Sequence, residues 1–208
     1  MPEDSKIPYV SFFKSRQRVD LENLQPEQVR IEDIAHDLSI IPRFAGGTAR
    51  PYSVAEHSLM VMEMVGAQNA DPETMLQALM HDATEYIIGD IPAPVKALIP
   101  EIRDWEQQVL WPVICEAFDI QTEISPIVKT ADWVALYVEA HSLYVTDVLE
   151  EWECYDKYMP MAEAWMEAHG EIAADNMPHP ALIEKVFIDT FETLRAACEA
   201  PDLEEAVG

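Results

Sequence analysis

The sequence is poor in basic residues and in cysteine. Its 208 residues include 13 lysines and arginines against 39 aspartates and glutamates, which gives a formal net charge of −26. Such a charge repels the phosphate backbones of nucleic acids and the surfaces of anionic membranes, so neither is an expected partner. The three cysteines lie far apart, and no pair has zinc-finger spacing. They indicate a reducing compartment, the cytoplasm of a bacterium or of a phage host, and no disulfide framework.

Long apolar runs are missing as well. No stretch approaches the roughly 20 apolar residues that span a bilayer, and the first residues lack the basic and apolar parts of a secretory signal. Alternating β-branched runs are scarce, and internal repeats are absent. We therefore expect an all-α fold, a single compact helical domain over residues 1–208. Its site-bearing core is expected over about 31–150, with the helices of 151–208 packing on it.

What is present is a His-Asp pair inside a helical pattern. Asp71 and the proline after it have the residue types of an N-cap and a first helical position, so a helix is expected over 71–88. Gly89 is expected to end it in a left-handed conformation. His81 and Asp82 lie within this helix, whose apolar residues recur at three- and four-residue steps. Burying the pair without partners would be costly, and a divalent cation is one way to satisfy both.

Two further stretches supply ligands of the right kind. Residues 53–61 and 129–136 have the apolar periodicity of a helix, and each places a metal-binding side chain on its apolar face. Three helices are then expected to present four ligands to one ion: His57, His81, Asp82 and Asp132. Two imidazoles with two carboxylates suit Mn, Fe, Co, Ni or Zn better than Mg or Ca.

A second His-Asp pair is a rival to the first. His36 and Asp37 fall in a helix that is expected over 31–39. No nearby Glu and no Gly-Asp run follow this pair. We interpret it as structural, with a place in the lining of a cleft as the alternative.

The order of these ligands resembles that of the HD-domain metal-dependent phosphohydrolases, and within them the bacterial and phage 5′-deoxynucleotidases. A His-Asp pair alone is a weak signal. The pair followed by Glu85 and a Gly-Asp-Ile-Pro-x-Pro-Val-Lys run, with a His before it and an Asp after it, is a strong one. The resemblance covers roughly residues 31–144, and its matching segments are Pro42-Arg43-Phe44, Val54–Ser58, His81–Glu85, Gly89–Lys96 and Lys129–Asp132.

Residues around the pair are candidates for catalysis. Glu85 lies one turn beyond His81 and therefore faces the same space. It is expected to act as acid or base for the attacking water, with the orientation of a ligand histidine as the alternative. Asp90 is a candidate for the same task or for contact with a substrate hydroxyl.

Cations near the proposed ligands are candidates for binding phosphate. Arg43 and Arg50 belong to a glycine-containing loop that leads into the segment with His57. Lys96 follows a loop that prolines make stiff. The resemblance implies that Arg43 and the aromatic Phe44 reach the substrate, whereas a cation at a helix terminus is the alternative for Arg43.

The resemblance implies a small-molecule nucleotide as substrate. The first hypothesis is hydrolysis of a deoxyribonucleoside 5′-monophosphate to deoxynucleoside and phosphate. The same site acting on a deoxynucleoside triphosphate, with release of triphosphate, is the alternative. A helical regulatory protein that binds metal without turnover is a second alternative, although Glu85 and Asp90 argue against it. The resemblance also implies a homo-oligomer, a dimer or a larger ring.

Overall fold

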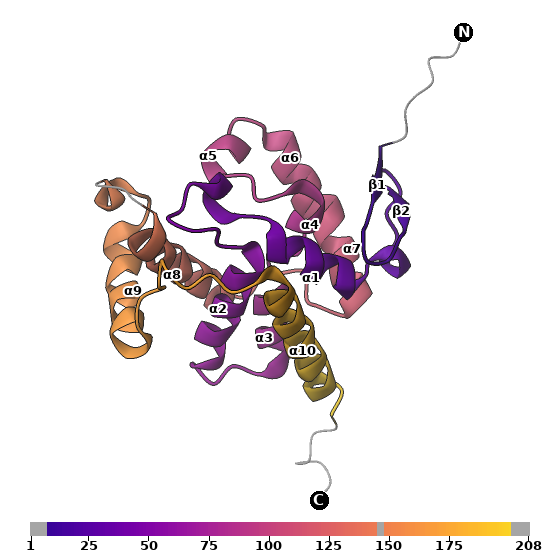
Figure 1. Cartoon of the computed structure of the whole chain (residues 1–208). Helices are drawn as coiled ribbons and strands as arrows, with labels where there is room; N and C mark the ends of the chain where they lie inside the picture. The colour runs from indigo at the N-terminus through magenta and orange to yellow at the C-terminus, as the bar shows by residue number, and fades with distance from the viewer. Residues whose placement is uncertain (1–7, 145–147, 201–208) are drawn as a thin grey trace, which may run out of the picture.

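The computed structural model describes residues 8–144 and 148–200. Helices make up most of this part, as Figure 1 shows, so the prediction of an all-α protein is confirmed. One short hairpin near the N-terminus is the exception, in which β1 (Tyr9–Ser11) pairs antiparallel with β2 (Arg18–Asp20). The helices are α1 (Ile31–Ile40), α2 (Val54–Gly66), α3 (Pro72–Met80), α4 (Glu85–Ile88), α5 (Ala93–Lys96), α6 (Pro100–Trp105), α7 (Trp111–Phe118), α8 (Pro126–Leu143), α9 (Tyr155–His169) and α10 (Pro180–Cys198).

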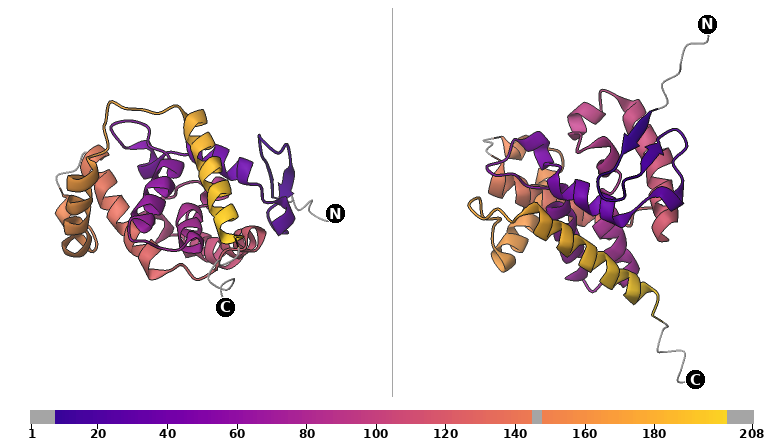
Figure 2. Two further views of the ribbon diagram at one scale, coloured as in Figure 1. Left: turned by 90° about the horizontal axis from the view of Figure 1, so that it is seen from below. Right: turned by 45° about the vertical axis from the view of Figure 1, so that its right-hand side comes forward.

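The middle of the molecule is formed by α2, α3 and α8. Helix α2 packs against both α3 and α8, and one continuous apolar core joins them. The helices after residue 150 cover this centre from different sides (Figure 2): α9 packs on α8, whereas α10 packs on α1 and α3. Within residues 8–144 and 148–200, the helices lack the combination of length and apolar character that is needed to cross a bilayer.

Local sequence signals explain where the central helices begin. Ser53 and Glu56 form a capping box at the start of α2, in which each side chain accepts a hydrogen bond from the other residue's backbone N–H. The side chain of Asp71 accepts from the N–H of Thr74 at 2.8 Å at the start of α3, as the sequence predicts. Ser125 caps α8 in the same way. The three helices that carry the site therefore start at fixed positions.

The helix expected over 71–88 is interrupted, so this prediction was wrong. Helix α3 ends at Met80 and α4 begins at Glu85, and the N–H groups of the intervening turn reach carbonyls only three residues back. The cause is visible at His81, whose Nδ1 donates to the carbonyl of Ala78 at 2.7 Å. A continuing α-helix would give that carbonyl to the N–H of Asp82, so the side chain competes with the helix. Gly89 follows α4 with φ of +75° and ψ of 166°, a positive φ but not a left-handed helical conformation.

Two other boundaries differ from the predicted ones. The apolar pattern of the helix that carries Asp132 predicts an end near residue 150, but this helix ends at Leu143; residues 145–147 lie outside the described part, and 149–151 form a 3-10 turn. Pro112 predicts a bend or interruption of a helix over 101–118, and the structure has a π-helix over Glu106–Leu110 between α6 and α7. Proline lacks the N–H that would bond the carbonyl four residues back, and a π-helical segment accommodates that loss.

Candidate metal centre

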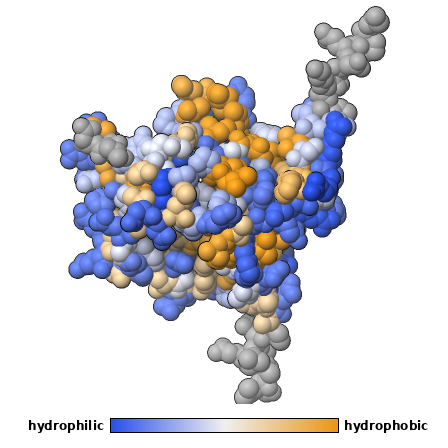
Figure 3. All heavy atoms as spheres, in the orientation of Figure 1, coloured by the Kyte–Doolittle hydropathy of each residue, from blue (hydrophilic) through white to orange (hydrophobic). Residues whose placement is uncertain are grey.

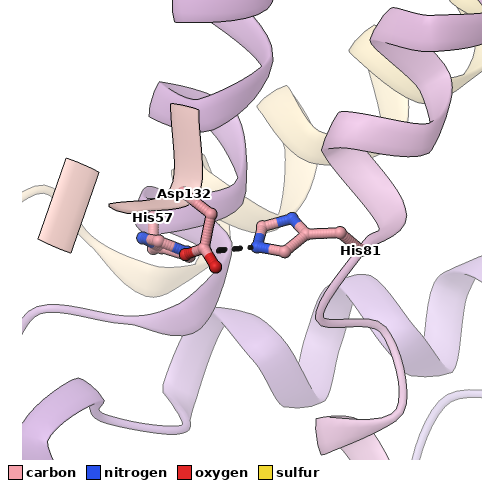
Figure 4. Close-up of side chains that lie close together, drawn as sticks. All are labelled: His57, His81 and Asp132. Carbon is pink, nitrogen blue, oxygen red and sulfur yellow. Dashed lines mark hydrogen bonds and ion pairs between the residues drawn. The ribbon is translucent and has the colours of Figure 1, made fainter. Parts of the chain in front are cut away.

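The structure brings the four predicted ligands together. His57 comes from α2, His81 and Asp82 come from the turn after α3, and Asp132 comes from α8. The Nε2 atom of His57 lies 3.2 Å from Nε2 of His81, 3.4 Å from Oδ2 of Asp82 and 3.2 Å from Oδ1 of Asp132. Nε2 of His81 lies 3.4 Å from the same Asp82 oxygen and 3.8 Å from the same Asp132 oxygen. Figure 4 shows both imidazoles and the Asp132 carboxylate pointing toward one another.

Hydrogen bonds behind the imidazoles set their tautomers. Nδ1 of His57 faces a carboxylate oxygen of Glu139 at 2.6 Å, and Nδ1 of His81 faces the carbonyl oxygen of Ala78 at 2.7 Å. Both partners only accept hydrogen bonds, so in each neutral ring Nδ1 carries the hydrogen and Nε2 carries a lone pair. This is the arrangement that metal-binding histidines adopt in proteins.

The donor set fits a transition-metal cation. The two lone pairs and an Asp132 oxygen lie within 4.8 Å of one another, and an Asp82 oxygen lies 3.4 Å from both nitrogens. These atoms repel one another unless protons or a cation lie between them. Atoms that bind one cation at about 2.1 Å lie roughly 3.0–3.5 Å apart, and most of the contacts in the cluster fall in that range. Two nitrogen and two oxygen donors are typical of Zn, Mn, Fe, Co or Ni sites. His57, His81, Asp82 and Asp132 would hold the ion.

The pKa values in the cluster have the directions expected of a cation site. Burial acts against the charged forms, yet the neighbouring carboxylates raise the pKa of His81 well above its usual value. Burial likewise opposes ionisation of Asp132, but hydrogen bonds from His57 and His81 hold its pKa well below the usual range. The cluster therefore attracts positive charge despite being enclosed by protein.

A hollow of about 710 Å³ opens from the cluster. Its volume lies in the range of small-molecule sites, which is roughly 300–1,000 Å³. Its lining combines Asp82, Asp132 and other charged groups with apolar and aromatic side chains. The lining residues are Arg43, Phe44, Asp82, Glu85, Asp90, Ile91, Pro92, Ala93, Pro94, Lys96, Asp132, Trp133, Leu136, Tyr144, Trp152 and Glu153.

Both candidate proton-transfer groups line this hollow. Glu85, the first residue of α4, is buried, and its Oε2 makes no hydrogen bond to any described residue. Burial raises the pKa of its carboxyl well above the usual value, with the charges of Asp82 and Asp90 acting in the same direction. Burial also raises the pKa of Asp90. The hollow thus holds two carboxyl groups that bind protons more tightly than free carboxyl groups do.

Two of the three predicted cations reach the hollow, and both are held by carboxylates. Arg43 lies at the end of the hollow nearest the cluster, with its Nη1 3.6 Å from Oδ2 of Asp82. The Nζ of Lys96 donates to both carboxylate oxygens of Glu106 at 2.8 and 3.0 Å and lies 3.8 Å from Oε1 of Glu85. Glu106 is the first residue of the π-helix.

Phe44 also lies where the sequence places it, and it belongs to an aromatic group. Its ring stacks on Tyr144 with centroids 5.1 Å apart, and Trp152 packs against Tyr144 at 5.9 Å. The residue has a φ of 53°, unusual for a side chain of this size, in a 3-10 turn over Arg43–Gly46. The turn directs Arg43 and Phe44 toward the same hollow although they are neighbours in sequence.

The structure places two sequence candidates elsewhere. Arg50 does not line the hollow beside the cluster; its guanidinium donates to Glu56 Oε1 at 2.9 Å and to the carbonyls of Pro51 and Ala173 at 2.7 and 3.2 Å. It lines a second hollow of about 610 Å³ between α2, α9 and α10. The rival histidine, His36, pairs with Glu184 on α10 at 2.9 Å, which agrees with a structural role.

Sequence reasoning missed Glu139, Glu106 and Trp152. Glu139 has the clearest signal, because it lies seven residues after Asp132 in α8 and therefore on the same face two turns later. Glu106 and Trp152 have no comparable spacing. Glu106 holds Lys96 from the π-helix, and Trp152 lines the hollow from the segment after α8; the sequence predicts neither position.

Comparisons with known proteins identify the family of the chain. Residues 33–110 match the family described as 5′-deoxynucleotidase YfbR-like. The uncharacterised protein YfdR of Escherichia coli K12 is 37% identical over 126 residues, which cover 61% of this chain and 67% of that protein. The chain belongs to the YfbR-like 5′-deoxynucleotidase family. An uncharacterised protein of Rhodobacter capsulatus is 46% identical over 89 residues, which cover 41% of this chain and 45% of that protein.

A solved structure shares the fold. It is titled cyanophage S-2L HD phosphohydrolase (DatZ) bound to dA and one catalytic Zn2+ ion, and it matches with a TM-score of 0.50 at 18% identity over 83% of this chain and 99% of that chain. This likeness concerns the fold, whereas the predicted resemblance to the 5′-deoxynucleotidases is confirmed by the family match and the relative in Escherichia coli. Membership of the YfbR-like family makes this protein a metal-dependent phosphoric ester hydrolase.

Proposed function

We propose that the protein hydrolyses deoxyribonucleoside 5′-monophosphates to deoxynucleosides and inorganic phosphate. The observation that carries the proposal is the cluster itself: two imidazole lone pairs and two carboxylates meet at one end of a hollow lined by an arginine and a buried carboxyl group. The family to which the chain belongs is named for this reaction. DatZ, which shares the fold, is bound to dA and to Zn2+.

The cluster would hold one divalent transition metal. A bound Mn, Co, Zn, Ni or Fe ion would supply Lewis acidity, which lowers the pKa of water and polarises phosphoryl oxygens. The protein contributes the geometry, because His57 and His81 are fixed from behind by Glu139 and the carbonyl of Ala78. Fixed ligands keep the site ready for the ion without rearrangement.

Glu85 handles the proton of the attacking water in this proposal. Its side chain lines the hollow, and its Oε2, although shielded from solvent, has no hydrogen-bond partner among the described residues, so the carboxyl group keeps an unused acceptor. A carboxyl group with a raised pKa is a better base than a free one, because proton transfer to it is more favourable. Asp90, on the same side of the hollow, is the second candidate and would serve the leaving 5′-oxygen or a sugar hydroxyl.

The charges in the hollow favour a monophosphate over a triphosphate. Of the described residues that line it, Arg43 and Lys96 carry positive charge, and each is already paired with carboxylates. Because both cations are already paired with carboxylates, little positive charge remains for a triphosphate, and the smaller negative charge of a monophosphate is matched better. Release of triphosphate from a deoxynucleoside triphosphate remains the alternative reaction of the same site.

The aromatic side of the hollow is suited to a nucleobase. Phe44, Tyr144 and Trp152 present ring faces or edges there, and bases stack on such groups without sequence-specific hydrogen bonds. The deoxyribose would then lie between this aromatic group and the charged end. The substrate is therefore a nucleotide held at both ends.

A direct assay tests the proposal. The purified protein, supplied with Mn2+ or Co2+, is incubated separately with deoxynucleoside mono- and triphosphates, and phosphate and triphosphate are measured. Release of inorganic phosphate from the monophosphate is expected. Triphosphate as the product would favour the alternative reaction, and bound metal with no turnover on either substrate would favour the non-catalytic one.

We also infer self-association and a cytoplasmic location. Exposed apolar side chains gather over α5 and the segment before α6 (Figure 3), where Leu98 is 82% exposed and Val95 and Ile99 are exposed as well. Contiguous apolar surface of this kind is typical of contact sites. The molar mass measured by light scattering during size-exclusion chromatography should exceed the 23.6 kDa of one chain.

A further inference from the structure

A buried carboxylate behind the cluster joins a candidate metal ligand to a candidate phosphate-binding group. Glu139 lies in α8, and its side chain is fully buried. Its Oε1 accepts a hydrogen bond from Nδ1 of His57 at 2.6 Å. Its Oε2 accepts from Nη2 and Nε of Arg43 at 3.0 and 3.3 Å. Each oxygen of one carboxylate therefore serves a different side chain of the site.

The comparison with the second imidazole shows that Glu139 does more than fix a ring. His81 is oriented by the backbone carbonyl of Ala78, which carries no charge. A carbonyl is thus enough to set a tautomer, whereas a fully buried carboxylate is unfavourable unless a cation compensates it. At His57 that cation is Arg43. The negative charge of the buried Glu139 is therefore compensated by the guanidinium of Arg43 and not by the imidazole of His57 alone.

The contacts close into a ring beside the expected ion position. Nη1 of Arg43 lies 3.6 Å from Oδ2 of Asp82, and that same oxygen lies 3.4 Å from Nε2 of His57. The ring runs from His57 to Glu139, to Arg43, to Asp82 and back. A guanidinium so close to a divalent cation would be repelled by it, and the negative charge of Glu139 offsets that repulsion. Arg43 can therefore remain beside the ion and face the hollow.

We propose that Glu139 is a positioning residue that holds the ion-binding nitrogen of His57 and the guanidinium of Arg43 in register with each other. Metal binding and phosphate binding then depend on one carboxylate. The statement about Arg43 rests on the proposed function, whereas the statement about His57 concerns metal binding alone.

Glu139→Gln tests the proposal with little change of volume. The amide offers one acceptor oxygen to two donors. Its NH2 group must then face an N–H of either His57 or Arg43, and two donors cannot form a hydrogen bond with each other. Metal-free protein is titrated with Co2+ and followed by the visible absorption of the bound ion. The Kd for Co2+ should rise about 10- to 100-fold, as for other losses of a group that orients a metal ligand. The Kd of the Co2+-loaded protein for inorganic phosphate should rise as well.

Arg43→Gln separates the two effects. It removes the phosphate contact and leaves Glu139 bonded to His57, so phosphate affinity should fall while Co2+ affinity is retained. The matched control is Glu56→Gln. It removes the carboxylate charge from a second Arg–Glu pair that is largely shielded from solvent, the pair of Arg50 with Glu56 at the start of α2. Glutamine still completes the capping box at this position. This control should change neither affinity.

Binding of both Co2+ and phosphate by Glu139→Gln with wild-type affinity would overturn the proposal. An equal loss in Glu56→Gln would do the same, because it would show a general effect of lost buried charge. If Glu139→Gln does not fold, as judged by circular dichroism, Glu139→Asp takes its place. It keeps the charge but is one methylene too short for both partners, so at least one affinity should fall, and wild-type values for both would overturn the proposal.

The outcome is separable from that of the proposed function. Co2+ and inorganic phosphate report on the site without any nucleotide. If the wild-type protein hydrolyses no deoxynucleotide and Glu139→Gln still loses Co2+ affinity, the proposed function fails and the role of Glu139 toward His57 stands.

Discussion

Arg43 and Arg50 belong to the same loop between α1 and α2, yet the two side chains line different hollows. Arg43 binds a buried carboxylate that also holds a candidate metal ligand, and its remaining nitrogen approaches Asp82. Arg50 is enclosed by one carboxylate and two backbone carbonyls. The two arginines differ in whether the guanidinium group keeps a side that is open to a ligand. Arg43 has a side open to a ligand, whereas the contacts of Arg50 fasten the segment around Ala173 to the start of α2.

The two hollows also differ in whether their polar groups are available to a ligand, although their volumes of about 710 and 610 Å³ are similar. In the first, imidazole lone pairs and carboxylate oxygens lie close to one another and face a common place. In the second, the histidine His169 stacks on Trp165 and its Nδ1 faces the carbonyl of that residue at 3.0 Å. Size alone therefore does not identify a site; unsatisfied groups that point at one place do.

The largest contrast is expected between one histidine of each hollow. His81→Ala removes a metal ligand, so bound metal and turnover should both fall more than about 100-fold, beyond the usual cost of losing only an orienting group. His169→Ala should leave both close to wild type. Metal content after dialysis and the rate of phosphate release check the pair. A His81→Ala protein that keeps its metal would remove the cluster from the proposal.

Replacing Arg43 should mainly lower catalytic efficiency, whereas replacing Arg50 should mainly lower the stability of the fold. Arg43→Ala should lower kcat/KM for a deoxynucleoside monophosphate by about 10²–10³, as for the loss of one group that stabilises transition-state charge. Arg50→Ala should leave kcat/KM within a few-fold but destabilise the fold by about 1–3 kcal/mol, because buried acceptors lose their donor. Steady-state kinetics and urea unfolding measure the two effects. Equal kinetic losses would show that the loop acts as one unit.

Glu85→Gln should separate catalysis from stability in the first hollow. Turnover should fall by about 10² or more if Glu85 handles the proton, while the metal is retained. Its raised pKa means that the folded state holds the proton more tightly than the unfolded chain. Glu85 therefore lowers stability as the pH rises above about 4.3 and through its folded pKa, and it has no such effect at lower pH.

In the metal-free protein, Glu85→Gln should thus raise the free energy of unfolding at pH 7 by an amount on the order of 1 kcal/mol or more. That gain should disappear near pH 4. Urea unfolding between pH 4 and 8 measures it. Glu171→Gln, at an exposed carboxyl in the lining of the second hollow, is the control and should change neither turnover nor stability appreciably. A gain that grows toward low pH would contradict the assigned direction.

These contrasts also mark how far the sequence alone leads. The proximity of the four candidate ligands and the place of Glu85 beside them were predictable, because helical periodicity and adjacency fix which side chains share a face. Glu139 follows from the same rule and was overlooked. The interruption of the helix at His81 was not predictable from periodicity, since it depends on a side chain that takes the carbonyl of Ala78 from the backbone.

Long-range partners set the remaining limit. The role of Arg50 is decided by a carbonyl 123 residues away in the sequence. Trp152 reaches the hollow only because α8 ends at Leu143, earlier than its apolar pattern predicts. Such contacts depend on how separate helices pack, and local sequence carries little information about packing.

The smallest effect is expected at the aromatic end of the first hollow. Trp152→Leu removes a ring on which a nucleobase can stack, and aromatic pairs contribute about 0.5–1.5 kcal/mol beyond area burial. KM for a deoxynucleoside monophosphate should therefore rise about three- to tenfold, with little change in kcat. Trp165→Leu makes the same change in the second hollow and should leave KM unaltered.

A substrate without a base sharpens this last contrast. 2-Deoxyribose 5-phosphate presents the same phosphate and sugar to Arg43 and the cluster but has nothing to stack on Trp152. Its KM should be the same for the wild-type and Trp152→Leu proteins. If the variant weakens both compounds equally, Trp152 acts by supporting Tyr144 and Phe44 in the fold, and the base must bind elsewhere in the hollow.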